Sequence, residues 1–443
     1  MNNKDKYGEV FTPSSLVENI IKDSFSFLHF DNVDNITVFE PGAGKGIFFE
    51  VMQNQQHIFG DNFKYILNEI NHENLLDLQN VSAKYSNNVE IIMKDLLSLK
   101  QEDFKFNSAD IVVGNLPFNS HSKKFVPSLA LNNKDDTTVT KPKSITLWNK
   151  MVHFCFENIL KPGGLFLAII PCIWLKKDKG GVYSLFTEQN EIVLLKVFDC
   201  QSANKLFKYN CQTPICYVLV RKRMEKEASI LSQRFKLFDK DKSHGYLNFT
   251  LRPGLCIPTN YVSNFINHHQ YLLESGCESC YNNLRKISTL KPICIKEKIC
   301  DFLKGGLEEY ITESTKQHYK IITGSLYNKK TDILTLNGFV STTPALYQGQ
   351  PKLILPHKRR AKFFKDYTGE YSCFGRDMYI FLCESNQQID LLYDFFNGNI
   401  INKMIGDGFT VRMNFIEKYV FQYIPWIFDE KFDSKCYETT CNQ

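Results

Sequence analysis

The stretch Asp110–Phe118, with the sequence DIVVGNLPF, predicts a buried strand that runs into a short polar loop. Three apolar β-formers in a row precede Gly114, which favours a tight turn at the end of the strand. The loop then offers an amide at Asn115, a proline at Pro117 and an aromatic ring at Phe118. An amide can accept a hydrogen bond from an exocyclic amine, and a flat ring can stack on a planar base. The pattern therefore predicts a site for an extruded nucleobase, with an ordinary strand exit as the alternative.

The composition is that of a soluble globular protein with a mild positive charge. Of the 443 residues, 43% are hydrophobic and 23% are charged, and the formal net charge is +5. We expect two domains from this length, and the charge permits a polyanionic partner. The polar N-terminus argues against a secretory signal, and the longest apolar run, Gly163–Leu175, is too short for a membrane span. Fourteen cysteines without such a signal indicate reduced thiols, so we expect a cytoplasmic protein that is not secreted.

A glycine-rich turn follows an earlier predicted strand, Ile36–Glu40. The turn, Pro41–Gly46, would let a ligand approach the backbone closely. Its spacing matches neither a phosphate loop nor a dinucleotide fingerprint. Glu40 stands directly before the turn, where its charge would repel phosphates but suit a cationic ligand such as S-adenosylmethionine. A purely structural turn is the alternative.

Two further predicted strands also end in acids. Tyr65–Glu69 ends at Glu69, and Val89–Asp95 ends at Asp95. Open α/β sheets bind ligands at the carboxyl ends of their strands, so we expect Glu40, Glu69 and Asp95 to lie along one edge. Glu69 would be placed for ribose hydroxyls. Each acid could instead be an ordinary solvated loop residue.

The remaining segments complete an α/β pattern. Ser15 and Glu18 predict a capping box for an amphipathic helix near the N-terminus. A second helix, residues 147–160, is expected to end at Lys161–Gly164. We expect a mostly parallel sheet with an antiparallel end strand. The predictions also include a mobile loop at residues 119–145 and strands at residues 165–170, 192–198 and 214–220.

Three motifs together resemble the γ-class adenine-N6 DNA methyltransferases, the Taq-type enzymes of restriction–modification systems. They are Gly8–Pro13, Phe39–Gly44 and Asn115–Phe118, in the order that defines the γ arrangement. Residues 145–175 resemble the central helix and strand of that family, and the resemblance extends over residues 7–221. It implies a Rossmann-like α/β sheet that binds S-adenosylmethionine, followed by a C-terminal mixed α+β domain that recognises double-stranded DNA.

The resemblance also implies a role for each motif residue. Asn115 and the backbone carbonyl of Leu116 would hold the N6 amine of a flipped-out adenine. Phe118 and Phe207 would stack on that base, although Phe207 could instead be a core residue. The implied reaction uses neither a metal nor a covalent enzyme intermediate. The S-adenosylmethionine pocket would be lined by Thr12, Glu40, Pro41, Gly42, Ala43, Gly44, Glu69, Asp95 and Pro117.

One residue departs from the family pattern. The family tetrad usually has proline at its second position, where this chain has Leu116. Proline would fix φ there, but the proposed chemical contribution is a backbone carbonyl, which every residue has. We therefore expect Leu116 to lower the rate without removing a functional group, and a decayed enzyme is the alternative.

We expect a catalytic domain at residues 1–225, a linker at residues 226–245 and a DNA-recognition domain at residues 246–443. A basic cluster beside aromatic residues predicts a phosphate clamp in the last part, with a solvated turn as the alternative. The expected DNA-binding residues are Lys358, Arg359, Arg360, Lys362 and Arg412. Zinc ligands are not expected, because the spacing of the nearby cysteines is irregular. Those cysteines are Cys277, Cys280, Cys294 and Cys300.

Two other functions remain open at the level of sequence. Protein glutamine methyltransferases use a similar Asn-Pro-Pro-aromatic loop, but their additional domain precedes the catalytic sheet, which is the reverse order. A DNA-binding protein that keeps the fold with weak catalysis would account for Leu116. We expect a monomer that acts on double-stranded DNA, and any partner restriction endonuclease would be a separate protein, because the chain shows no nuclease motif.

Overall fold

The computed structural model divides the chain into two compact units. The first comprises residues 1–257 and 411–413, and the second comprises residues 258–410 and 414–443. The structure describes residues 10–27, 36–55, 63–85, 88–118, 146–178, 180–207, 213–224, 232–240, 245–285, 300–301, 319–328, 333–356, 363–374, 378–411 and 416–441. The expected mobile loop at residues 119–145 lies outside this described part.

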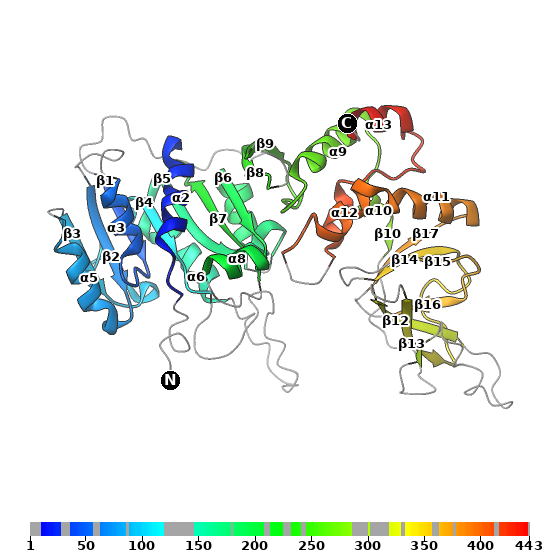
Figure 1. Ribbon diagram of the computed structural model, residues 1–443, viewed down its shortest axis with the longest axis horizontal. Coiled ribbons are helices and arrows are strands. Elements are labelled where there is room, and N and C mark those ends of the chain that lie inside the picture. Colours follow the sequence, from blue (N-terminus) through cyan, green and yellow to red (C-terminus); the bar gives the residue numbers. More distant parts are fainter. Residues whose placement is uncertain are drawn as a thin grey trace. The chain divides into compact units, whose positions relative to one another are not determined.

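The first unit is built around a sheet with nine described strands (Figure 1). They are β1 Ile36–Pro41, β2 Phe63–Glu69, β3 Asn88–Met93, β4 Ala109–Asn115, β5 Leu160–Pro171, β6 Glu191–Phe198, β7 Ile215–Arg221, β8 Gln233–Phe238 and β9 Tyr246–Leu251. Their order in the sheet is β3-β2-β1-β4-β5-β7-β6-β8-β9. Neighbours from β3 to β5 are parallel. The order reverses between β1 and β4, and ligands of open α/β sheets bind at the carboxyl ends of strands at such a point.

This sheet confirms the expected α/β class. The predicted strand at residues 214–220 is β7, which lies inside the sheet, antiparallel to both β5 and β6. β8 then pairs in parallel with β6, with Leu194 opposite Lys236, and β9 pairs antiparallel with β8. A sheet that ended at β6 would leave the backbone groups of that strand unpaired, and β8 supplies their partners.

A buried glutamine fixes β8 to the sheet. The Gln233 side-chain oxygen accepts a hydrogen bond from the N–H of Ile192 at 2.9 Å. Its amide nitrogen contacts three backbone carbonyl oxygens of the segment 186–190 at 2.7–3.1 Å. Because a buried amide is stable only when its polar atoms are paired, this anchor makes β8 an integral strand. The segment expected as a linker, residues 226–245, contains β8, and the first compact unit continues through β9 to residue 257.

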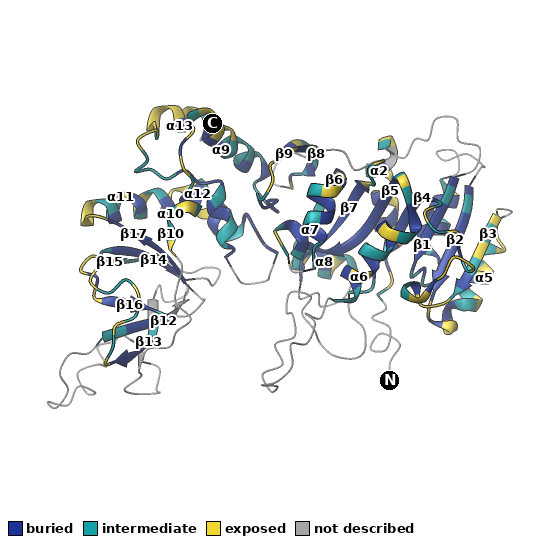
Figure 2. Ribbon diagram, turned by 180° about the vertical axis from the view of Figure 1, so that it is seen from behind, coloured by how far each residue is buried: buried dark blue, intermediate teal, exposed yellow. Residues whose placement is uncertain are grey.

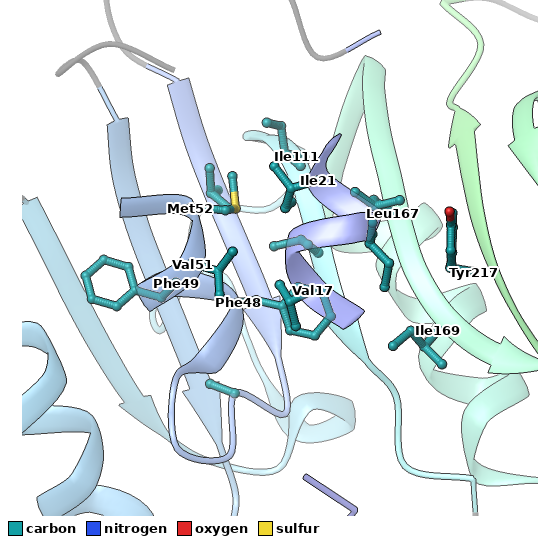
Figure 3. Packing of buried hydrophobic residues seen from close by; sticks show 14 of the residues in the cluster. Val17, Ile21, Phe48, Phe49, Val51, Met52, Ile111, Leu167, Ile169 and Tyr217 are labelled. Atoms are coloured by element: carbon teal, nitrogen blue, oxygen red, sulfur yellow. The ribbon is translucent and has the colours of Figure 1, made fainter. Parts of the chain in front are cut away.

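Helices cover the sheet, and one face has a large apolar cluster. Figure 3 shows Val17 and Ile21 of α2 beside Ile111 of β4 and Leu167 of β5, with Met52 of α3 nearby. Helix α8 also contributes to this cluster. Because side chains alternate along a strand, residue 115 of β4 faces the same side as Ile111. The helices are α2 Ser14–Ser24, α3 Ile47–Asn54, α5 Leu75–Ser82 and α8 Cys200–Phe207.

Helix α2 begins earlier than its predicted cap. Ser15 lies inside the helix, and the hydroxyl of Ser14 donates to the Glu18 carboxylate at 2.9 Å. The carbonyl of Pro13 accepts the N–H of Leu16 at 3.0 Å and so begins the helical hydrogen-bond pattern. Proline suits this place because its missing N–H would have had no helical partner.

The predicted boundary between helix and strand near residue 160 is also corrected. Helix α6, Leu147–Phe154, continues into a π-helical turn, Cys155–Ile159, and β5 already starts at Leu160. The segment expected to stop the helix is instead a bulge in β5, where the register with β4 shifts. Gly163, with φ +79°, donates its N–H to the carbonyl of Lys222 at 2.8 Å. That bond satisfies a backbone group which the bulge removes from the ladder.

The second unit has the expected mixed α+β character. One sheet has the strand order β10-β17-β14-β15, and the other has the order β11-β13-β12-β16. Their bounds are β10 Leu284–Arg285, β11 Cys300–Asp301, β12 Tyr319–Asn328, β13 Ile333–Ser341, β14 Lys352–Pro356, β15 Phe364–Asp366, β16 Tyr371–Cys373 and β17 Met378–Leu382. The helices are α9 Val262–Ser275, α10 Cys280–Asn283, α11 Asn386–Asn397, α12 Asn399–Asp407 and α13 Ser434–Cys441.

Burial follows position in the large sheet. Figure 2 shows β1, β2 and β4 buried along nearly their whole lengths, whereas the edge strand β3 has mainly exposed and partly buried residues. Such partial exposure is usual for a strand with one covered face. Within the described part of the chain, none of the helices has both the length and the apolar character that crossing a membrane requires.

Candidate active site

The amide of Asn115, the last residue of β4, is held by the segment that precedes α2. Its Nδ2 atom donates to the carbonyl oxygen of Val10 and to Oγ1 of Thr12, both at 3.1 Å. A carbonyl oxygen can only accept, so the Val10 contact requires that the nitrogen, and not the oxygen, of the Asn115 amide faces it. Both amide hydrogens then have partners within the protein. Oδ1 is consequently the amide atom that takes no part in these two hydrogen bonds.

Leu116 is buried, with 1% of its surface exposed. Its N–H points to the carbonyl oxygen of Ile169 in β5 at 3.4 Å, a long hydrogen bond that continues the β4–β5 pairing. A proline, which has no N–H, could not make this contact. The structure thus shows that burial and pairing restrain Leu116, where a proline ring would restrain φ.

The loop after Asn115 lies against the glycine turn. A Cβ atom on Gly42 would lie 3.7 Å from Cδ of Pro117, and the φ of Gly42 is +73°. A side chain at Gly114 would approach the Pro41 carbonyl oxygen at 3.6 Å. Glycine at position 42 is explained by its left-handed backbone, which costs other residues about 1–2 kcal/mol. The expected cofactor turn and the expected catalytic loop therefore meet at the carboxyl ends of β1 and β4.

Backbone hydrogen bonds tie this turn to the neighbouring strands. The N–H groups of Gly42 and Ala43 both donate to the carbonyl of Asn68, at 2.9 and 2.8 Å. The Asn68 side chain is buried and donates to the carbonyls of Ile92 and Lys94, at 3.1 and 2.9 Å. Sequence reasoning missed Asn68, although a polar residue just before the strand-terminal acid was a signal for it. The ends of β1, β2 and β3 are thereby fixed together.

Glu40 is a buried acid with an incomplete set of partners. Its Oε2 atom is buried and has no hydrogen-bond partner. Burial raises the pKa of this carboxyl well above its ordinary value, the backbone N–H groups of Phe49 and Phe48 oppose that rise, and the nearby charge of Glu69 adds to it. A cationic group placed at Oε2 would both pair the oxygen and favour the ionised carboxylate.

The other two acids differ from Glu40. The Glu69 carboxylate accepts the N–H of Gly44 at 2.6 Å, of Ile70 at 2.9 Å and of Asn71 at 2.7 Å, which holds it beside the glycine turn. Asp95 is exposed. It accepts the Leu97 N–H at 3.0 Å as the cap of a short 3-10 helix, Leu96–Ser98. Of the three expected acids, the structure thus brings Glu40 and Glu69 to the turn and gives Asp95 a capping role.

Three phenylalanines lie on the elements that carry the candidate site. Phe118 and Phe207 are half-buried, and both pack against the apolar cluster that includes α2 and β4. Phe207 ends α8. Phe11, which sequence reasoning did not single out, is 50% exposed, and a Cβ atom on Gly44 would lie 3.7 Å from its ring. Its position directly before Thr12 in the first motif was a signal for a place at the turn.

The expected DNA-binding residues cannot be placed. They are Lys358, Arg359, Arg360, Lys362 and Arg412, and all of them lie outside the described residues. Of the cysteines considered as zinc ligands, Cys277 and Cys280 are buried free thiols. Cys277 contacts the carbonyl of Trp426 at 3.6 Å, and burial raises its pKa to about 11. Among the described residues, no three His, Cys, Asp or Glu side chains are arranged to hold a metal ion.

A model of the N-6 DNA Methylase family matches residues 1–241. No curated protein matches in a direct comparison of sequences.

Three solved structures show a distant likeness. The methyltransferase subunit of a type I restriction-modification system from Streptococcus thermophilus is 17% identical, with a TM-score of 0.36, and the match covers 55% of this chain and 51% of that one. The type IIG restriction endonuclease BpuSI is 14% identical, with a TM-score of 0.44, and the match covers 98% of this chain and 61% of that one. The ATP-dependent Type ISP restriction-modification enzyme LlaBIII, bound to DNA, is 12% identical, with a TM-score of 0.40, and the match covers 84% of this chain and 33% of that one. The chain thus spans less than two thirds of each of these proteins.

With TM-scores this low, the assignment rests on the family model alone. That model covers more than half of the 443 residues, including the glycine turn, both acids beside it and the Asn115 loop. The chain therefore belongs to the N-6 DNA methylase family.

Proposed function

We propose that this protein transfers a methyl group from S-adenosylmethionine to the N6 amine of an adenine extruded from double-stranded DNA. The observation that carries the proposal is the orientation of the Asn115 amide. Nδ2 donates to Val10 and Thr12, so in this proposal Oδ1 would be the atom that faces the substrate. An amide oxygen accepts hydrogen bonds and does not donate them, so it favours a substrate group that donates hydrogen bonds, as an N–H group does. The exocyclic amine of adenine is such a group.

The residues of the glycine turn fit the proposed cofactor. Gly42 and Gly44 have positive φ, so the backbone offers an open cradle without side chains. The unpaired Oε2 of Glu40 suits an ammonium group, and Glu69, fixed by three backbone donors, suits ribose hydroxyls. S-adenosylmethionine, when bound, would supply an electrophilic methyl group. Pro117, which lies against Gly42, would close the site on the side of the catalytic loop.

In this proposal the protein acts by positioning. Oδ1 of Asn115 and the carbonyl of Leu116 would accept the two N–H bonds of the amine, which draws the nitrogen lone pair out of conjugation with the base. Positioning of this kind can supply about 7–11 kcal/mol in ideal cases. Phe118 and Phe207 would each contribute about 1–3 kcal/mol of stacking. That stacking would offset the cost, a few kcal/mol, of extruding the base.

We assign DNA recognition to the second unit as part of the same proposal. Lys358, Arg359, Arg360, Lys362 and Arg412 would neutralise phosphates, because clustered basic side chains supply affinity that is independent of sequence. We propose that the protein acts as a monomer in the cytoplasm. Any cognate restriction endonuclease would be a separate protein.

The variant Asn115→Ala tests the proposal. We expect it to nearly abolish N6 methylation while S-adenosylmethionine binding stays within a few-fold of that of the wild type. Methylated adenine and its sequence context would be measured by sequencing DNA from expressing cells, and cofactor binding would be measured by calorimetry. Asn19→Ala is the matched control, since Asn19 is exposed on α2 and its side chain donates to the local carbonyl of Ser15.

Near-normal methylation by Asn115→Ala would contradict the assigned role of the loop. A wild-type protein that binds S-adenosylmethionine but never methylates DNA would instead support the catalytically weak DNA-binding protein. Transfer to a glutamine side chain of a protein, without transfer to DNA, would support the glutamine methyltransferase.

A further inference from the structure

Thr12 and Asn115 are 103 residues apart in the sequence and meet in a hydrogen bond of 3.1 Å. Thr12 is buried and Asn115 is partly buried. The resemblance to known methyltransferases places Thr12 only in the cofactor pocket. Its contact with the amide of the catalytic loop points to a second role.

The two contacts of Asn115 Nδ2 do different things. The Val10 carbonyl can only accept, so it decides which end of the amide faces inward. The Thr12 hydroxyl can both donate and accept, so it would tolerate either end. What Thr12 adds is a second fixed point. A planar amide with two anchored hydrogens cannot rotate about its terminal bond, a torsion that is otherwise soft.

The two partners are carried by elements that pack in one core. Val17 and Ile21 of α2, the helix that follows Thr12, lie in the same apolar cluster as Ile111 and Val113 of β4. Figure 3 shows Val17, Ile21 and Ile111 together on this face of the sheet. A hydrogen bond between side chains on rigidly packed elements can hold a reacting group within the narrow range that catalysis needs.

We infer that Thr12 is a positioning residue, which sets the plane of the Asn115 amide so that Oδ1 points to the target amine. This inference rests on the proposed function. Without the hydroxyl, Val10 would still keep the nitrogen inward, but the amide plane could swing. The target amine would then be held less often in the reactive geometry, so turnover would fall while binding of cofactor and DNA would not.

The test compares Thr12→Val with Thr12→Ser in the full chain. Valine keeps the branched shape and removes the hydroxyl, whereas serine keeps the hydroxyl. We expect Thr12→Val to lower kcat about two- to tenfold, the range of one neutral hydrogen bond, and to leave KM for DNA and Kd for S-adenosylmethionine within twofold. Thr12→Ser should restore at least half of the lost kcat. The pair Thr12→Ser and Thr12→Ala, which also differs by one hydroxyl, replaces the first pair if the valine variant has a lowered Tm.

The outcomes separate the inference from the function on which it rests. A wild-type protein that transfers no methyl group to DNA overturns both. An active wild type whose kcat is unchanged in Thr12→Val overturns the inference alone. So does a Thr12→Val variant that loses affinity for S-adenosylmethionine at unchanged kcat, because Thr12 would then serve only the cofactor.

Discussion

Two buried carboxyl groups, Glu40 in the first unit and Asp366 in the second, have opposite surroundings. Asp366 forms an ion pair with the buried Lys352 at 2.6 Å. It also accepts the N–H groups of Glu370 and Tyr371, at 3.0 and 3.1 Å. Glu40 is equally buried, but its Oε2 has no partner, and burial raises its pKa well above the ordinary value. Both acids are buried, but only Asp366 has partners for both of its carboxylate oxygens.

The difference shows how a structural charge can be told from a binding charge. Lys352 uses its three N–H bonds on Asp366 and on the carbonyls of Tyr347 and Gln350, both at 3.0 Å. The polar atoms of this ion pair are satisfied within the protein, so the pair does not need a ligand. An oxygen left unpaired at the ligand-binding edge of a sheet is costly unless something else pairs it. The Glu40 carboxyl, which has an unpaired oxygen, therefore points to a ligand, and the fully paired Asp366 carboxyl does not.

The largest effect is expected from breaking the complete pair. Lys352→Ala should lower the free energy of unfolding of the second unit by about 3–5 kcal/mol, because it leaves the Asp366 charge buried and unpaired. Urea titration would measure it. Lys365→Ala is the matched control, since its ion pair with Asp390 is partly exposed and should be worth about 1 kcal/mol at most.

The double variant Lys352→Met/Asp366→Leu sharpens this result. Removing both charges should recover part of the loss. It should not recover all of it, because the backbone groups that the pair satisfied lose their partners. A Lys352→Ala variant as stable as the wild type would show that the buried Asp366 does not need its ion pair with Lys352 for stability.

A smaller effect is expected at the incomplete acid. Glu40→Gln should weaken S-adenosylmethionine binding about tenfold to a hundredfold, the range of a hydrogen bond to a charged group, about 1.5–3 kcal/mol. Calorimetry would measure the affinity. Glu90→Gln, on the exposed edge strand β3, should leave the affinity unchanged.

The same variant should have the opposite effect on the ligand-free protein. Above the ordinary pKa of glutamate, about 4.3, the unfolded wild-type chain releases a proton that folded Glu40 retains. Wild-type stability should therefore fall as pH rises through this window, by up to about 1.4 kcal/mol per pH unit, until folded Glu40 ionises. Glu40→Gln lacks this pH dependence, so its stability relative to that of the wild type should increase as pH rises. Equal pH slopes in thermal melts would show that Glu40 is already ionised and paired.

The smallest effect is expected at Phe207, whose ring is only partly buried. Phe207 packs on the core with one part and is otherwise exposed, so its open part could stack on the target base. Phe207→Ala should weaken the extruded state by about 1–3 kcal/mol. The deficit should shrink when the target adenine lies opposite a gap, because less pairing is then broken. Equal losses of turnover on paired and gapped DNA, with a lowered Tm, would make Phe207 a core residue.

Local patterns predicted much of the first unit. The apolar runs at residues 36–40, 65–69 and 110–115 form β1, β2 and β4, because alternating or continuous apolar side chains suit a covered sheet. Parallel strands place their carboxyl ends at one edge, so Glu40 and Glu69 could be expected together. The sequence did not predict that Asp95 would cap a short helix, because an acid after a strand fits both a binding role and a capping role.

Contacts between distant segments were decided only by the tertiary structure. Nothing in the run Asp110–Phe118 shows that Asn115 donates to Val10 and Thr12, and nothing near Gln233 shows that it joins β8 to the sheet. The sequence was enough to predict strands such as β1, β2 and β4, because periodicity reflects burial on one face and depends on neighbouring residues. The direction of a side-chain amide, the completeness of a buried charge and the partner of an edge strand depend on atoms far away in the sequence. Only the folded path of the chain brings those atoms within hydrogen-bond distance.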